Sequence, residues 1–225
     1  MDGGPYLIVF DCDGTLVDSG HIIVDTMSAA WRAEGLTPPA ADDIRHQIGL
    51  PLGQAIANLH PDGDRDSVDR LCDAYKNVFV SGRNIGAHQE PLYDGCADVL
   101  ALLAAEDAYL LGVATGKGRR GLDHTLERHG IGRHFHVLKT ADDGPGKPNP
   151  HILQDAMAET GASPWNTVVI GDTIFDIGMA VSAGAHAIGV SWGYHPPHEL
   201  RKAGARSVAD LFHDIPALVR EIWTA

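Results

Sequence analysis

The stretch YLIVFDCDGTLVDS, residues 6–19, decides the fold of this 225-residue chain. Residues 6–10 form a continuous apolar run rich in β-forming side chains, which predicts a strand buried on both faces of a parallel sheet. Asp11 and Asp13 follow where that strand should end. Because ligands of open α/β sheets bind outside the carboxyl ends of the strands, we expect both carboxylates to face a binding site. Gly14 then allows a sharp turn.

The letters DxDGT also have a purely local explanation. An Asx-type turn at the end of a strand would place Asp and Gly here without any functional role. A chance match to four fixed letters in a chain of this length has a probability on the order of one in a thousand. The motif therefore indicates a site, and its position after a predicted buried strand strengthens that interpretation.

The composition narrows the classes of partner. The chain has 17 Lys and Arg against 30 Asp and Glu, a net charge of -13, which argues against nucleic acid or an anionic membrane as a partner. An acidic protein that acts on an anion needs local positive charge, so we expect a metal ion and a few placed cations. Cys12, Cys72 and Cys96 are widely spaced and predict neither disulfides nor a zinc site. We expect a cytoplasmic protein, because no secretory leader or membrane-length apolar run is evident.

The region after Ser19 changes to a helical pattern. Apolar residues recur at spacings of three and four over residues 22–31, and further helical segments are predicted at 42–48, 52–59 and 67–80. No strand pattern interrupts them. We therefore predict a small helical domain over residues 20–86, inserted into a core made of residues 1–19 and 87–225.

The remainder of the chain alternates helices and strands. Strands are predicted at 109–114, 136–139, 167–170 and 185–190, between helices at 96–106, 122–129, 150–160, 174–183 and 209–223. Alternation of this kind predicts right-handed βαβ crossovers and a parallel sheet covered by helices on both faces. The strand at residues 6–10 joins this sheet across the helical insertion.

Three further motifs place polar and charged residues at the same predicted edge of the sheet. Thr115 and Gly116 directly follow an apolar strand, Lys147 lies in the loop GPGKPNP, and Asp172 and Asp176 follow another buried strand one helical turn apart. Each has a local explanation: a Thr-Gly turn, a solvated lysine or a helix cap. Because independent strand and loop ends would meet in one crevice, their coincidence favours a site.

Together these motifs resemble those of the haloacid dehalogenase superfamily of phosphohydrolases, with an acidic first motif, a Ser/Thr second, a Lys third and an acidic fourth. The resemblance implies an α/β fold: a Rossmann-like, doubly wound parallel sheet with an inserted helical cap of the C1 type. DGTLVDS, TGKGRR, KPNP, GDTIFDI and GVSWGYH are similar to the phosphoglycolate phosphatase-like branch. That similarity implies a phosphatase acting on a small phosphorylated metabolite such as 2-phosphoglycolate, and we expect a monomer or a homodimer.

The resemblance also implies catalytic roles. Asp11 would be the nucleophile that forms an aspartyl-phosphate, and Asp13 the general acid and base. Crowding of two carboxylates raises the pKa of one of them, which suits a proton donor near neutral pH. Thr115, the Gly116 amide and Lys147 would bind the phosphoryl oxygens.

A magnesium site is implied by the same motifs. Asp11, Asp172 and the main-chain carbonyl of Asp13 would hold Mg²⁺, a hard cation that prefers oxygen ligands. Asp176 would act at this site through a water molecule or by holding the lysine of the third motif.

Two segments are candidates for shaping the substrate site. Residues 44–54, IRHQIGLPLGQ, carry Gly and Pro bends together with Arg45 and His46, and could present a specificity loop to the core, although an ordinary interhelical turn has the same pattern. Residues 189–195, GVSWGYH, would follow the fifth strand and lie at the rim of the site. A structural role for Trp192 and Tyr194 is an equal alternative.

Other activities share part of this pattern. A β-phosphoglucomutase-like enzyme, or a pyrophosphatase or nucleotidase of the same superfamily, would use the same core motifs. A dehalogenase has no leaving alkoxide to protonate, so Asp13 argues against it. A phospho-aspartate receiver domain of the signalling type also uses Asp, Thr and Lys with Mg²⁺, but the helical insertion and the early DxD motif argue against it.

Overall fold

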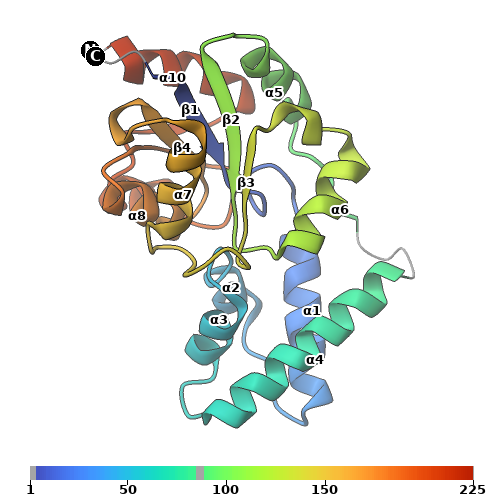
Figure 1. Ribbon diagram of the computed structural model, residues 1–225. Coiled ribbons are helices and arrows are strands. Elements are labelled where there is room, and N and C mark those ends of the chain that lie inside the picture. Colours follow the sequence, from blue (N-terminus) through green and yellow to red (C-terminus); the bar gives the residue numbers. More distant parts are fainter. Residues whose placement is uncertain (1–3, 85–88, 225) are drawn as a thin grey trace.

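A six-stranded sheet forms the centre of the protein, whose computed structural model describes residues 4–84 and 89–224 (Figure 1). The strand order is β3-β2-β1-β4-β5-β6, and every neighbouring pair is parallel. The strands are β1 (Tyr6–Phe10), β2 (Tyr109–Ala114), β3 (Val137–Lys139), β4 (Thr167–Gly171), β5 (His186–Val190) and β6 (Ser207–Ala209). The predicted strand at residues 6–10 is therefore confirmed and lies in the middle of the sheet.

Helices cover both faces of the sheet. In β1, Leu7 and Val9 point into one hydrophobic cluster while Ile8 and Phe10 point into the other, which explains why all four side chains are apolar and fully buried. The first cluster includes helices α7 (His151–Thr160), α8 (Ile174–Ser182) and α9 (Pro197–Ala203), and the second includes α5 (Cys96–Ala104), α6 (Arg119–His129) and α10 (Ile215–Thr224). The expected doubly wound α/β fold is confirmed.

A helical insertion lies between β1 and β2. It comprises α1 (Gly20–Ala33), α2 (Ala41–Arg45), α3 (Leu52–Leu59) and α4 (Arg65–Asn84), and Figure 1 shows these helices below the sheet. They share a hydrophobic cluster separate from the two core clusters: Val24, Met27, Trp31, Ile44, Ile56 and Leu71. This arrangement agrees with the expected C1-type cap, and we call α1–α4 and their connections the cap. The predicted boundary between residues 86 and 87 lies outside the described residues.

The C-terminal region differs from the sequence-based prediction of one helix over residues 209–223. In this range the structure has the last residue of the short strand β6, a 3₁₀ helix at Phe212–Asp214 and α10, and helix α9, which precedes β6, was not predicted. Strand β6 has only three residues, so it shows no usable alternation, and it forms because β5 offers an edge for pairing.

Smaller differences concern element ends. Helix α4 continues to Asn84, beyond the predicted end at residue 80, and α6 begins at Arg119 rather than at residue 122. Two further 3₁₀ helices lie at Gly132–His134 and Pro164–Asn166. Within the described ranges, no helix combines the length and apolarity needed to cross a membrane.

Candidate active site

The predicted site residues meet at the carboxyl ends of the central strands. Asp11 directly follows β1, Thr115 follows β2 and Asp172 follows β4, so the parallel register brings them to one edge. A cavity of about 500 Å³ lies between this edge and the cap. Asp11, Asp13, Thr115 and Gly116 line its core side, which we call the floor.

Lys147 connects two of the carboxylates. Its Nζ lies 2.7 Å from Asp11 Oδ1 and also pairs with Asp176 Oδ1, and all three side chains are buried. Burial alone would lower the pKa of Lys147, but attraction by Asp11 and Asp176 outweighs it and raises the pKa above its usual value. The lysine is therefore a fixed cation. Burial raises the pKa of Asp11 to about 7, against the opposing effect of Lys147.

Three carboxylates form a cluster that fits a divalent cation. Oxygen atoms of Asp11, Asp172 and Asp176 lie within 4.8 Å of one another. Within the described part of the chain, Asp11 Oδ2 is buried and accepts no hydrogen bond. Burial, and then repulsion from the other two carboxylates, raises the pKa of Asp172 well above its usual range. A bound cation would remove this repulsion, and an all-oxygen donor set suits Mg²⁺.

Asp176 already has partners on both oxygens. Its Oδ1 pairs with Lys147, while Oδ2 accepts hydrogen bonds from Thr173 N at 3.0 Å and from Thr173 Oγ1 at 2.7 Å. Thr173 is also the N-cap residue of α8, so the cap of this helix fixes the Asp176 side chain. This geometry favours the role of holding Lys147 over direct coordination of a metal ion.

Asp172 is oriented by two segments distant in sequence. Its Oδ1 accepts a hydrogen bond from Thr15 Oγ1 and its Oδ2 one from Tyr194 N, both at 2.9 Å. A Cβ atom on Gly14, which has φ +83°, would overlap Asp172 and Tyr194. The turn after β1 therefore needs glycine for two reasons: its backbone conformation, and the close approach of Asp172 and Tyr194 to this position. The side chain of Trp192 also contributes, since its Nε1 donates to Thr15 O at 3.2 Å, so the segment of residues 189–195 supports the site through one backbone amide and one indole.

Asp13 is held through one of its oxygens. Ser19 Oγ donates to Asp13 Oδ1 at 2.6 Å, and Lys117 Nζ lies 2.9 Å from the same atom. No hydrogen bond to Oδ2 from the described residues is found. The side chain is thus anchored on one side, which leaves Oδ2 available to exchange a proton with a ligand in the cavity.

Lys117 is itself held by a buried glutamate. Its Nζ lies 3.3 Å from Glu90 Oε1, while Thr125 Oγ1 donates to Glu90 Oε2 at 3.0 Å and His129 Nε2 contacts the Glu90 carbonyl at 2.7 Å. Neither Lys117 nor Glu90 was predicted as a site residue from the sequence. Lys117 lies two residues after Thr115 in the motif TGKG, so a signal was present. Glu90 precedes Pro91 without any pattern that marks it.

The predicted specificity segment lies against the cavity, but through other side chains than expected. Gln47, Ile48, Gly49 and Leu50 line the cavity. Arg45 is largely exposed, and its Nη1 pairs with Asp42 Oδ1 of the same helix at 2.7 Å. The segment also touches the floor, since a Cβ atom on Gly116 would lie 2.8 Å from the Gly49 carbonyl oxygen.

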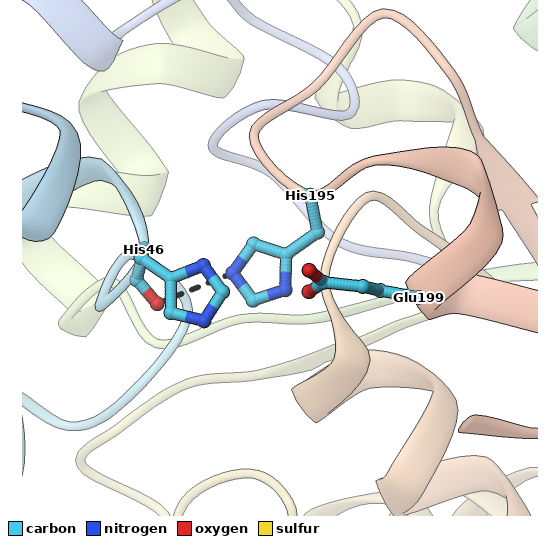
Figure 2. A group of neighbouring side chains, drawn as sticks. All are labelled: His46, His195 and Glu199. Atoms are coloured by element: carbon cyan, nitrogen blue, oxygen red, sulfur yellow. Dashed lines mark hydrogen bonds between the residues drawn. The ribbon is translucent and has the colours of Figure 1, made fainter. Parts of the chain in front are cut away.

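His46 contacts the core outside the cavity. Its ring stacks on that of His195, with centroids 4.2 Å apart and planes 8° from parallel (Figure 2). His195 Nδ1 accepts a hydrogen bond from Ile174 N at 3.2 Å, so its Nε2 carries the hydrogen and donates to the His46 carbonyl, also at 3.2 Å. Glu199 lies on the other side of His195 and completes a group of potential metal ligands. Stacked rings with both nitrogens of His195 engaged are poorly arranged for one ion, so this group is a contact between cap and core.

Comparison with known proteins agrees with this geometry. The family model described as haloacid dehalogenase-like hydrolase matches residues 8–190. This chain belongs to that family. The match begins in β1 and ends with β5, so it includes all four motifs at the floor of the cavity and the whole cap.

Individual members of the family carry different names. "Probable phosphatase IndB" of Dickeya dadantii is 35% identical over 93% of this chain and 91% of its own length. "Tyrosine-protein kinase PtkA" of Mycobacterium tuberculosis is 31% identical over 84% of this chain, which covers 63% of that protein. A phosphoglycolate phosphatase of Photobacterium profundum is 27% identical over 96% of both chains.

The fold is shared with solved structures. The crystal structure of a hydrolase from Pseudomonas syringae superposes with a TM-score of 0.85 at 27% identity, over 96% of this chain and 99% of that one. The chain is therefore an enzyme of the haloacid dehalogenase-like hydrolase family, of the phosphatase type. Membership in this family excludes the receiver domain as an explanation of the Asp, Thr and Lys residues.

Proposed function

We propose that this chain is a Mg²⁺-dependent phosphomonoester hydrolase that acts on a small phosphorylated metabolite through an aspartyl-phosphate on Asp11. The observation that carries the proposal is the state of Asp11: Lys147 holds Oδ1, while Oδ2 is buried at the cavity floor with no hydrogen bond from the described residues. A carboxylate oxygen without a hydrogen bond is an effective nucleophile. The name of the Photobacterium relative makes 2-phosphoglycolate the first candidate substrate.

The first step is attack of Asp11 on phosphorus with release of the alcohol. Lys147 stays charged and neutralises the charge that develops near Asp11. Thr115 Oγ1 accepts a hydrogen bond from Lys117 N at 3.2 Å, which leaves its own hydrogen free to donate to a phosphoryl oxygen together with the Gly116 amide. Asp13 gives a proton to the departing alkoxide.

The second step releases phosphate from Asp11. Asp13, now ionised, removes a proton from a water molecule that attacks the phosphorus of the aspartyl-phosphate. The contacts of Ser19 and Lys117 with Oδ1 keep the carboxylate oriented in both steps. The cap, proposed as residues 20–86, excludes water during the first step and admits it for the second.

Asp11, Asp172 and the main-chain carbonyl of Asp13 would hold Mg²⁺, with Asp176 supporting the site through Lys147. The ion, when bound, supplies positive charge that stabilises the phosphoryl oxygens and reduces repulsion between the carboxylates.

The experiment is phosphate release from a panel of small phosphoesters, with Mg²⁺ and with EDTA. Wild-type protein releases phosphate only with Mg²⁺, and Asp11→Asn lowers kcat by a factor on the order of 10⁴ or more, because the nucleophile is lost. Asp25→Asn, a change at an exposed aspartate of α1, is the matched control and retains activity. Undiminished turnover by Asp11→Asn would exclude Asp11 as the nucleophile.

The same panel separates the related activities. Labelled phosphate that appears in solvent identifies a hydrolase, whereas transfer to a second hydroxyl of a sugar phosphate identifies a mutase. Pyrophosphate and nucleoside monophosphates in the panel test the remaining alternatives. The cytoplasmic location and the monomeric or homodimeric state stay predictions.

A further inference from the structure

The cap side of the cavity is lined almost entirely by apolar side chains. They come from α1, α4 and the α2–α3 region, and six of them are Ile23, Met27, Ile44, Leu52, Phe79 and Val80. The volume of about 500 Å³ falls in the range of pockets that enclose an organic ligand of moderate size. A two-carbon acid would leave much of this space unfilled.

Three polar side chains in the described part of the cap reach the cavity: Gln47, Tyr75 and Lys76. Gln47 Oε1 accepts a hydrogen bond from Asn58 Nδ2 at 2.7 Å. Lys76 lies 3.6 Å from Asp73 in a largely exposed pair. Among the described cap residues, this leaves mainly the Gln47 amide nitrogen and the Tyr75 hydroxyl to contact a ligand. A sugar ring with several hydroxyls placed against this side would lose more hydrogen bonds to water than these two groups replace, and each unsatisfied buried hydroxyl weakens binding.

Among the described residues that line the cavity, no buried cation is free to pair with a second anionic group either. Lys117 is the cation closest to the proton-carrying aspartate, and both Asp13 and Glu90 neutralise it. Arg120 lines the cavity but is exposed, so it lies in high dielectric, where an ion pair with a ligand is weak. The carboxylate of 2-phosphoglycolate would therefore be recognised poorly.

We propose that the preferred substrate is a phosphomonoester whose alcohol carries an apolar body of several carbon atoms, aliphatic or aromatic. This inference rests on the proposed hydrolase function and specifies its substrate class. The floor holds the phosphoryl group, and the apolar body lies against the cap side, where it displaces water from apolar surface. The cap then determines which alcohol portion is bound, while phosphoryl transfer takes place at the floor.

The test is a series of ethyl, butyl and hexyl phosphate, whose leaving groups have similar basicity but different apolar area. We expect kcat/KM to rise about threefold to fourfold for each added methylene group, and hexyl phosphate to exceed both 2-phosphoglycolate and glucose 6-phosphate. A flat series, or a preference for 2-phosphoglycolate or the sugar phosphate, overturns the substrate class.

A pair of variants locates the effect. Val80→Thr keeps the side-chain shape but adds a hydroxyl at the cavity, and should lower the hexyl-to-ethyl ratio of kcat/KM several-fold. Val181→Thr makes the same change in α8, away from the cavity, at a valine that is similarly exposed (51% against 42%). It should leave the ratio unchanged. Equal ratios in the two variants would place the selectivity elsewhere and overturn the assignment to the cap.

Binding separates this inference from the proposed function. Ethyl and hexyl phosphonate cannot be hydrolysed, and their dissociation constants, measured by calorimetry with Mg²⁺, should differ in the same direction as kcat/KM. If no phosphoester is hydrolysed but hexyl phosphonate binds more tightly, the hydrolase proposal fails and the apolar specificity stands. If hydrolysis occurs without any dependence on chain length in turnover or binding, the apolar specificity fails and the hydrolase proposal stands.

Discussion

The floor of the cavity carries the carboxylates of Asp11 and Asp13 beside Thr115 at the ends of core strands, whereas most side chains on the cap side are apolar and belong to helices. At the floor, Lys147 pairs with Asp11 and Asp176, and both oxygens of Asp172 accept hydrogen bonds. On the cap side, Phe79 and its apolar neighbours provide apolar contact area, which does not orient a ligand as hydrogen bonds or charges would. Under the proposed function, this difference separates two tasks: the fixed charges would position the phosphoryl group, and the cap would select what is attached to it.

Among the side chains that hold the site without forming a bond to the substrate, the largest effect is expected from removing the cation Lys147. Lys147→Met leaves the buried Asp11 and Asp176 without their positive partner, so kcat should fall by about 10²–10³-fold. The free energy of unfolding should fall by about 3–5 kcal/mol. Chemical denaturation and steady-state kinetics measure the two effects.

Lys139→Met is the control for this change. Lys139 pairs at 3.0 Å with Glu159, whose side chain is 57% exposed, so its removal should cost less than about 1 kcal/mol. If the two variants lost the same free energy of unfolding, the buried ion pairs of Lys147 would contribute no more to stability than an exposed ion pair. The proposed difference between the floor and the cap side would then be wrong.

An intermediate effect is expected at the residue that holds Asp13. Lys117→Met removes one of the two contacts with Asp13 Oδ1, and kcat/KM for an alkyl phosphate should fall by about tenfold to 100-fold. The loss should be much smaller for p-nitrophenyl phosphate, because p-nitrophenolate leaves without a proton. Steady-state kinetics on both esters provide the comparison.

Arg119→Met tests whether any nearby cation has this effect. Arg119 pairs with Asp143 at 3.5 Å and does not contact Asp13, so both esters should be unaffected. An equal loss on the alkyl and aryl esters in Lys117→Met would show that Lys117 maintains structure instead of orienting the proton carrier.

The smallest effect is expected where the cap meets the floor. Gly49 has φ +101°, and an added Cβ would lie 3.1 Å from Thr173 Oγ1, so Gly49→Ala strains the backbone and crowds this contact. Gly35→Ala has a similar backbone strain at φ +72° with no atom within 4 Å of the new Cβ. Both should lower Tm by about 2–4 °C per kcal/mol of strain.

Only Gly49→Ala should also raise KM, by a few-fold, because only that change disturbs the approach of the cap to the core. Steady-state kinetics on the best substrate, with thermal unfolding as the measure of strain, separate the two contributions. An unchanged KM in Gly49→Ala would mean that this contact does not govern substrate binding.

Much of the site was predictable because its signals are local. Asp11 and Asp13 follow a five-residue apolar run, and a strand buried on both faces needs such a run. Thr115 and Asp172 follow runs of the same kind. Parallel strands place these ends at one edge without any further information, and that is why motifs separated by many residues of sequence converge.

Other parts were not predictable from local patterns. Glu90 reaches Lys117 only because the segment after the cap returns beside α6, where Thr125 fixes the carboxylate. Strand β6 is three residues long and depends on the edge of β5. His46 lies in a segment with the expected bends, yet its ring packs on His195 instead of lining the cavity. Each of these depends on a partner distant in sequence.

The sequence alone determined the α/β core, the helical insertion and the chemistry of the floor, because hydrophobic periodicity and the residues at strand ends are properties of short segments. Only the tertiary structure decided which oxygen of Asp13 is held and which face of each cap helix meets the cavity. Helical periodicity marks apolar residues without stating what they cover. The packing of the cap against the core therefore decides that a mainly apolar surface faces the floor of the cavity.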